Sequence, residues 1–124
     1  MQVKIDTREK FHAITILETN FAANMTAEFE NCLLSLLQND VKNVVLILKD
    51  IQKIENAAAE KLVQIQQTYY ERDSSFVICE LNPSVETELD KIGLLELMNV
   101  CPTEAEASDI VHMEEIEREL LDEE

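Results

Sequence analysis

Residues 44–65 read VVLILKDIQKIENAAAEKLVQI, and this stretch decides the fold class of the chain. Its first five residues, Val44 to Leu48, form a continuous run of β-branched and leucine residues. Such a run indicates a strand that is buried on both faces, as in the middle of a parallel sheet. The residues that follow predict a helix to about Arg72, because apolar side chains recur at helical spacing: Ala58, Leu62, Ile65 and Tyr69. The turn from Lys49 to Ala58 therefore lies at the carboxyl end of the strand, where open α/β sheets bind their ligands.

The sequence on either side continues this alternation of strands and helices. Two strands, near residues 3–5 and 11–18, flank a polar turn, and residues 25–37 predict a helix with one apolar stripe. After the central unit we expect a buried strand at 76–81, a short helix from Pro83 that ends at the left-handed Gly93, a short strand near 98–101 and a last helix. This order predicts a single α/β domain over residues 1–124, with a mixed central sheet of about four to five strands and about four helices.

The composition limits the classes of function. A hydrophobic content of 46%, with one glycine and two prolines, fits long regular elements joined by short connections. The net charge of -16 would repel nucleic-acid phosphates and anionic lipid surfaces, so we expect no nucleic-acid partner. A basic protein surface fits better, although acidity also keeps a protein soluble. The N-terminus lacks an apolar signal core and no apolar run is long enough to cross a bilayer, so we expect a cytoplasmic protein without direct membrane insertion.

The residues able to carry chemistry form no catalytic or metal-binding pattern. Cys32, Cys79 and Cys101 are widely spaced without a CxxC motif, which favours buried free thiols. His12 is expected at a solvated strand position and His112 in a surface ion pair, and neither has a nucleophile beside it in the sequence. The chain has no glycine-rich phosphate loop, and it lacks the early acidic pair and late lysine of a receiver domain. We therefore expect no enzyme activity, metal or cofactor.

The turn into the central helix carries the most informative residues. Asn56 is expected to be the N-cap, because an asparagine oxygen accepts well from free backbone N–H groups. Ala57 to Ala59 are interpreted either as good helix formers or as small residues that let a partner's backbone approach. Of Ile51 and Ile54, one is expected in the core, and an exposed one would be a contact residue. Glu55 lies near a helix N-terminus, which favours its charge, and it could pair with a partner's arginine.

The same stretch resembles the central segment of the STAS domain, a family that includes bacterial anti-sigma-factor antagonists and the cytoplasmic tails of sulphate transporters. Family members have a hydrophobic strand, a loop with Asp or Glu, and a helix that begins Ser-Ser/Thr-Gly. Here Glu55 takes the acidic place, Asn56 stands where the phosphorylated Ser or Thr would be, and Ala57 and Ala58 stand for the small residue and the Gly. AANMTAEF (22–29), Gly93-Leu94 and VCPTEAEA (100–107) resemble other family segments in the same order.

The resemblance implies a STAS-like fold and a non-enzymatic protein–protein interaction module. The antagonists bind an anti-sigma factor that is also a GHKL-type kinase, and phosphorylation at the helix start releases this partner. Because Asn56 has no hydroxyl, the resemblance implies binding without phosphorylation at the usual site. The predicted contact surface comprises Ile51, Ile54, Glu55, Asn56, Ala57, Ala58 and Ala59. Another regulatory protein as partner and a weak homodimer stay open.

Other readings of the chain also stay open. One alternative is a structural STAS subunit of a membrane transport or stress-sensing complex, and another is an enzyme or small-ligand protein. Ser74 and Ser75 are interpreted as turn residues before a strand. The last helix, about residues 103–121, belongs to a segment with ten acidic residues and one arginine. We expect its apolar stripe to dock on the sheet, leaving an acidic outer face that is solvated or steers a basic partner: Ile110, Met113, Ile116 and Leu120.

Overall fold

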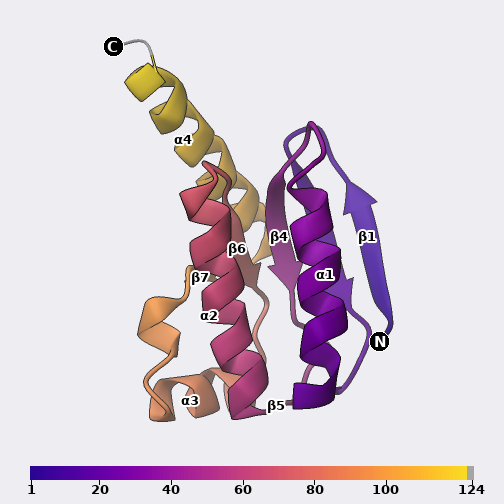
Figure 1. The fold of residues 1–124 in the computed structure, drawn as a ribbon. Helices are drawn as coiled ribbons and strands as arrows, with labels where there is room; N and C mark the ends of the chain where they lie inside the picture. The colour runs from indigo at the N-terminus through magenta and orange to yellow at the C-terminus, as the bar shows by residue number, and fades with distance from the viewer. Residues whose placement is uncertain (123–124) are drawn as a thin grey trace.

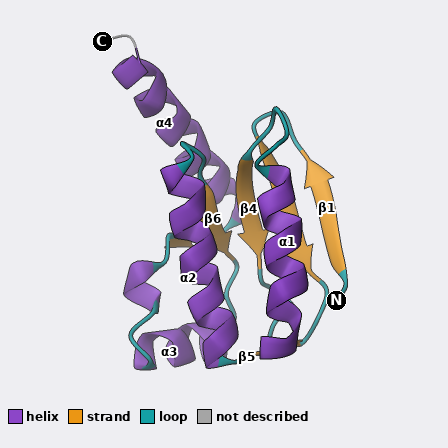
Figure 2. Cartoon of the chain, in the orientation of Figure 1, coloured by secondary structure: helices purple, strands orange, loops and turns teal. Residues whose placement is uncertain are grey.

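The computed structural model describes residues 1–122, which build a mixed five-stranded sheet with helices on both faces (Figures 1 and 2). The sheet strands are β1 (Val3–Thr7), β2 (Phe11–Ile16), β4 (Asn43–Ile47), β6 (Phe76–Cys79) and β7 (Val100–Cys101), in the spatial order β1-β2-β4-β6-β7. The first pair is antiparallel and the other pairs are parallel. A separate parallel pair joins β3 (Asn20–Phe21) to β5 (Lys53–Ile54).

Four α-helices and two short 3₁₀ turns connect the strands within the described residues. The helices are α1 (Thr26–Leu36), α2 (Asn56–Glu71), α3 (Pro83–Lys91) and α4 (Glu104–Asp122). The 3₁₀ turns are η1 (Ala23–Met25) and η2 (Leu95–Leu97). The predicted fold class, a mixed sheet of four to five strands with about four helices, is confirmed.

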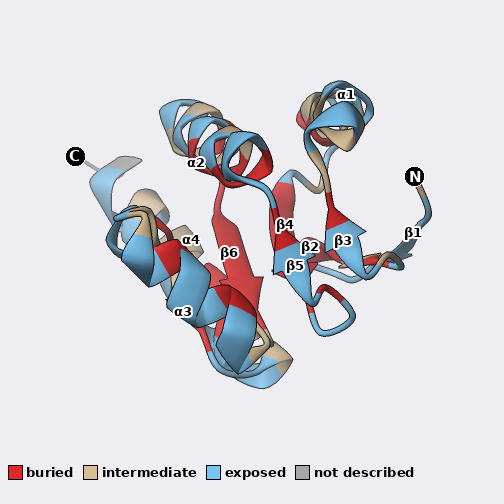
Figure 3. Ribbon diagram, turned by 90° about the horizontal axis from the view of Figure 1, so that it is seen from below, coloured by how far each residue is buried: buried red, intermediate tan, exposed pale blue. Residues whose placement is uncertain are grey.

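The position of β4 between two helical layers explains why its residues after Asn43, Val44 to Ile47, are all apolar. In the end-on view of Figure 3, α1 and α2 lie on one side of the sheet and α4 on the other. Val44 and Leu46 belong to the core under α1 and α2, whereas Val45 and Ile47 belong to the core under α4. Because successive strand side chains point to opposite faces, a strand between two helical layers needs apolar residues throughout.

Local signals place several element ends where the sequence predicts them. Gly93 follows α3 with a φ of 76°, and the Leu94 N–H donates to the Leu89 carbonyl oxygen at 3.0 Å, which is the bond of a Schellman helix end. Thr103 caps α4, because its Oγ1 accepts from the Glu106 N–H at 3.2 Å. No described helix is long and apolar enough to span a bilayer.

The two histidine predictions are wrong in part. His12 is buried, not solvated: its Nδ1 lies 2.9 Å from Thr7 Oγ1 and its Nε2 lies 2.8 Å from the Val41 carbonyl oxygen. These partners satisfy both ring nitrogens and let a polar ring enter the sheet. His112 is exposed as predicted, but the ion pairs of the described residues do not include it.

The predictions for the cysteines and for the two serines before β6 are confirmed except at Cys32. Cys79 and Cys101 are buried free thiols, whereas Cys32 is only half-buried. Ser74 and Ser75 lie in the turn before β6, as interpreted, and both are buried.

The prediction for the last helix is wrong about its packed face. Met113, Ile116 and Leu120 are 61%, 51% and 60% exposed, and Ile110 is only partly buried. The buried side chains that dock on the sheet are instead Ala107 and Val111, four residues apart, and the partly buried Ile110 packs against the same core as predicted. Smaller residues let the helix approach the sheet closely, and the larger apolar residues are left on the outer side.

Candidate functional site

The turn between β4 and α2 lies at the carboxyl end of the parallel strands, at the lower end of the molecule in Figure 1. The segment is held by backbone hydrogen bonds to the chain that follows β2. The Gln52 N–H donates to the Thr19 carbonyl oxygen at 2.7 Å, and the Lys53 N–H donates to the same oxygen at 3.2 Å. The β3–β5 pair extends this contact, so the turn is fixed to a neighbouring strand.

Asn82 fixes the other side of the turn. Its side-chain Nδ2 donates to the Lys49 carbonyl oxygen at 3.0 Å and to the Ile51 carbonyl oxygen at 2.5 Å. Its own carbonyl oxygen accepts from the Val85 and Glu86 N–H groups, at the beginning of α3. One residue thus joins the helix start of α3 to the loop after β4, and the loop is restrained between β3 and α3.

Glu55 joins two helical starts. It is the residue before α2, in an extended conformation with φ -79° and ψ 151°. Its side-chain Oε1 accepts from the Ala23 N–H at 2.8 Å, and its own N–H donates to the Phe21 carbonyl oxygen at 3.0 Å. The carboxylate therefore satisfies a free N–H at the start of η1, and this bond between positions 32 residues apart brings α2 beside η1.

The prediction that Asn56 caps α2 is wrong. The helix begins at Asn56, and Glu55 occupies the N-cap position without a side-chain capping hydrogen bond. Asn56 is the first helical residue and is exposed. The side-chain hydrogen bonds of the described residues include none from Asn56, so its amide faces solvent.

The structure divides the seven predicted contact residues into two sets. Glu55, Asn56 and Ala57 are exposed at the start of α2. The other four side chains are buried in the same hydrophobic core as Phe21: Ile51, Ile54, Ala58 and Ala59. Their contact role stays a prediction, and no more than 7% of each of these side chains is exposed. Ala58 and Ala59 are small so that the first turn of α2 can lie close to the core.

A groove runs beside the exposed residues, between β3, β5 and α3. It encloses about 490 Å³ and is lined by polar and charged residues around an apolar floor: Asn20, Gln52, Lys53, Ile54, Glu55, Ser84, Val85 and Glu88. Ser84 donates through Oγ to the Gln52 carbonyl oxygen at 3.4 Å. Ser84 is therefore a hydroxyl close to the turn in space, although no hydroxyl lies near it in sequence.

The sequence pattern did not indicate Asn82 or Ser84. Both act on the turn from about 30 residues away, and neither has a local motif there. The proline at the first position of α3 marks a helix start, which is the one signal that could have drawn attention to the asparagine before it.

The exposed side chains around the turn have mixed charge. Lys49, Asp50, Lys53 and Glu55 are exposed or border the groove. The Cys79 carbonyl oxygen accepts from the Leu48 N–H at the end of β4. Burial raises the pKa of the Cys79 thiol to about 12, so it is protonated at neutral pH and is a poor nucleophile. In residues 1–121, no cluster of three or more His, Cys, Asp or Glu side chains is placed to hold a metal ion.

Comparison with protein families places the chain in the class of STAS domains. The STAS domain model matches residues 4–107, so the chain belongs to the STAS family. The fold is the STAS fold, and the resemblance read from the turn is confirmed at this level. A search of curated proteins found no match.

Solved structures agree with the family. A putative anti-sigma factor antagonist from Thermotoga maritima matches with a TM-score of 0.74 and 16% identity, covering 89% of this chain and 94% of that one. The anti-sigma factor antagonist SpoIIAA, in its unphosphorylated form, matches with a TM-score of 0.70 and 12% identity over 90% and 96% of the two chains. A murine anion transporter of the solute carrier 26 family matches with a TM-score of 0.69 and 14% identity, covering 83% of this chain and 18% of that one.

Proposed function

We propose that this STAS domain is a non-enzymatic binding module of the anti-sigma-factor-antagonist type, which binds a regulatory protein through the start of α2. The observation that carries the proposal is the exposed Asn56 at the first helical position, on a turn that Asn82 and Glu55 hold in place. A rigid surface loses little conformational entropy on binding, which favours recognition.

The proposed partner is an anti-sigma factor or a GHKL-type kinase, and the contact surface is redrawn from the burial of the side chains. It comprises Glu55, Asn56 and Ala57 together with the groove toward Ser84 and Glu88. The four buried residues support this surface from below: Ile51, Ile54, Ala58 and Ala59.

The proposed regulation differs from that of a phospho-switched antagonist. A phosphoryl group adds about two negative charges at a helix start and changes the contact there. An asparagine amide accepts no phosphoryl group, so binding at this surface is constitutive with respect to a partner kinase.

The test is capture of partners from the organism that encodes the chain, using wild type, Ala57→Arg and Gln67→Arg. Both positions are exposed on α2 and both substitutions add one positive charge, but only Ala57 lies at the turn. We expect an anti-sigma factor or GHKL-type kinase to be captured by wild type and Gln67→Arg and to be lost with Ala57→Arg. Equal capture by all three proteins would place the contact elsewhere.

A second experiment examines the missing hydroxyl. The captured kinase is incubated with ATP and either wild type or Asn56→Ser, and the peptide at the start of α2 is analysed by mass spectrometry. We expect phosphate on this peptide only in Asn56→Ser. Phosphate on the same peptide of the wild type would contradict constitutive binding, because Asn56 would then not be the residue that controls modification.

The second candidate function is a structural STAS subunit of a membrane transport or stress-sensing complex. It is supported by the likeness in fold to a domain that makes up 18% of a murine anion transporter chain. The same capture experiment separates the two candidates, since this function predicts co-purification with membrane transport or scaffold subunits in place of a kinase.

A further inference from the structure

The outer half of α4 has its polar and apolar sides reversed relative to an ordinary surface helix. Its outer side carries three large exposed apolar side chains, each 51% to 61% exposed: Met113, Ile116 and Leu120. Surface helices normally turn such residues toward the core. The reversal therefore needs a physical cause and has a consequence for what the helix can bind.

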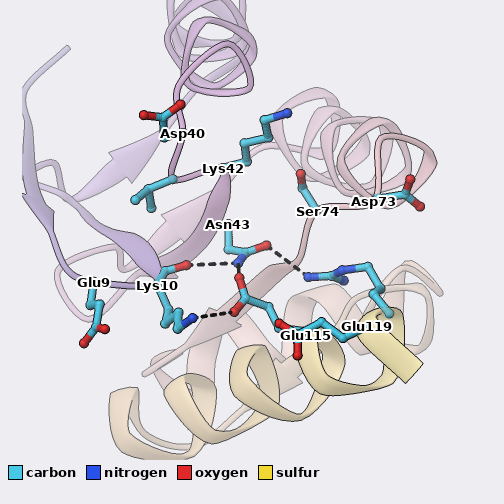
Figure 4. Close-up of a pocket in the computed structure, with 11 residues that line it drawn as sticks. Glu9, Lys10, Asp40, Lys42, Asn43, Asp73, Ser74, Glu115 and Glu119 are labelled. Atoms are coloured by element: carbon cyan, nitrogen blue, oxygen red, sulfur yellow. Dashed lines mark hydrogen bonds and ion pairs between the residues drawn. The ribbon is translucent and has the colours of Figure 1, made fainter. Parts of the chain in front are cut away.

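The cause is a network of hydrogen bonds and one ion pair on the inner side of the helix, which we call the polar clamp. Figure 4 draws its contacts around Asn43, Lys10 and Glu115. Asn43, at the first position of β4, donates from Nδ2 to the Lys10 carbonyl oxygen at 2.9 Å and to Glu115 Oε1 at 2.7 Å. Lys10 Nζ lies 3.5 Å from Glu115 Oε2. Arg118 donates to Ser75 Oγ at 3.2 Å and to Asn43 Oδ1 at 3.3 Å.

Tyr70 completes the clamp from α2. Its hydroxyl donates to Glu114 Oε1 at 2.8 Å and accepts from Asn99 Nδ2 at 2.7 Å. Glu114, Glu115 and Arg118 thus face the amino end of the sheet, and they fix the rotation of α4. With this rotation the apolar residues of the last turns cannot reach the core.

The exposed residues have the spacing of a coiled-coil seam. Met113, Ile116 and Leu120 are three and four residues apart, which corresponds to heptad positions a, d and a. Glu117 and Glu119 then occupy the flanking e and g positions, and both are exposed. None of the ion pairs of the described residues uses either carboxylate.

These charges select the occupant of the seam. A second copy of the chain would set Glu117 and Glu119 against identical carboxylates, and like charges at e and g disfavour pairing. An anionic lipid surface is excluded by the same charges, because helices that lie on membranes carry Lys and Arg on their polar face. A partner helix with apolar a and d positions and basic e and g positions complements both features.

We propose that the outer half of α4 is a docking surface for a basic amphipathic helix of another protein, paired along the seam of Met113, Ile116 and Leu120. The surface lies at the end of the sheet opposite to the start of α2, so it is separate from the contact proposed for Asn56 (Figure 1). If no helix binds to α4, the proposed function at the start of α2 is unaffected. If no partner binds at the start of α2, the proposal for α4 is likewise unaffected.

The test uses three synthetic peptides of three heptads each, with binding measured by fluorescence anisotropy at physiological salt. The matching probe has Leu at a and d and Lys at e and g. The second probe has Glu at e and g. The third has the composition of the matching probe in scrambled order, so that its apolar residues form no stripe. We expect the wild-type chain to bind the matching probe at least tenfold more tightly than either of the other two.

Substitutions in the chain test whether the matching probe binds along the seam. Ile116→Ser with Leu120→Ser is expected to weaken the matching probe at least tenfold, whereas Leu97→Ser, at a 52% exposed leucine on η2, leaves it unchanged. Glu117→Lys with Glu119→Lys is expected to reverse the preference between the Lys and Glu probes. Circular dichroism checks that each variant keeps the fold.

Two results would overturn the proposal. Equal binding of the matching and scrambled probes would show charge attraction without a seam. The second result would be a wild-type dimer in analytical ultracentrifugation that becomes monomeric in the variant Ile116→Ser with Leu120→Ser. It would show that a second copy of this chain binds to the seam.

Discussion

The two ends of the parallel strands are stabilised by different means. At the carboxyl end, the turn before α2 has its apolar residues Ile51, Ile54 and Ala58 in the core and its polar residues outside, so hydrophobic burial and hydrogen bonding act together. At the amino end, the clamp around Asn43 puts the polar groups inside and leaves the apolar side chains of α4 outside. A network of polar groups can thus set the orientation of a helix against its own hydrophobic pattern.

We expect the greatest loss of stability when a buried alanine of α2 is substituted, and almost none at its exposed neighbour. Ala58→Arg places a charge at a position with 0% exposure, and we expect it to destabilise the domain by more than about 4 kcal/mol or to prevent folding. Ala57→Arg, one residue earlier and exposed, is expected to change stability by less than about 0.5 kcal/mol. Urea unfolding measures both. Similar stabilities would mean that α2 begins with a different rotation.

The next prediction compares two apolar residues on α4. Val111→Ala is expected to cost about 2 kcal/mol, because the side chain is fully buried against the sheet. Ile116→Ala removes more carbon atoms but from a 51% exposed side chain, and we expect less than about 0.5 kcal/mol. Thermal unfolding of both variants ranks them. A larger loss for Ile116→Ala would mean that the apolar stripe docks on the sheet after all.

Asn82 provides a smaller effect at the carboxyl end. Asn82→Ala removes two side-chain hydrogen bonds to the loop after β4, and we expect a loss of about 1–2 kcal/mol together with faster amide hydrogen exchange in that loop. Asn39→Ala, at an exposed position after α1, serves as the control with no expected change. Unaltered exchange in Asn82→Ala would show that the β3–β5 pair alone holds the loop.

The smallest effect concerns Tyr70 in the clamp. Burial, followed by its hydrogen bond to Glu114, raises the pKa of Tyr70 to about 12, above the usual value of about 10. The neutral phenol is therefore favoured in the folded state, so its contribution is fully present below about pH 10 and is lost as the pH rises through 12. Tyr70→Phe is expected to cost about 1 kcal/mol at pH 8, with the difference from wild type shrinking between pH 10 and 12. A difference that stays constant across this range would contradict the assignment.

The sequence predicted those parts of the fold that depend on local periodicity. The run from Val44 to Leu48 and the spacing in α2 are repeated signals, and both elements form where they were expected. The face of α4 was missed because the prediction ranked side chains by hydrophobicity, which favours Ile116 over Ala107. The smaller residues pack on the sheet, and the polar groups that fix the helix come from segments distant in sequence, namely Lys10, β4, α2 and the turn before β6.

The turn with the candidate site forms where the sequence predicted it, but only some of its residues lie as expected. The turn after a buried parallel strand is a general position for ligand binding, and the acidic and amide residues there mark it further. Asn56 was expected at the N-cap, but it is the first residue of α2. N-cap preference alone locates a helix boundary only to within one or two residues. The bonds from Ala23 and Asn82 to the turn cross more than 30 residues, and no local pattern in the sequence contains them.

These long-range bonds set the order in which the proposed contact surface can form during synthesis. The turn before α2 is complete only when Ala23, on the N-terminal side, and Asn82, on the C-terminal side, have both reached it. Contacts that are distant in sequence form late because the chain must first close the intervening loops. A nascent or truncated chain that ends before residue 82 therefore lacks the finished surface. Partner binding at this turn would report that two βα units have already folded, which protects the partner from capture by incomplete chains.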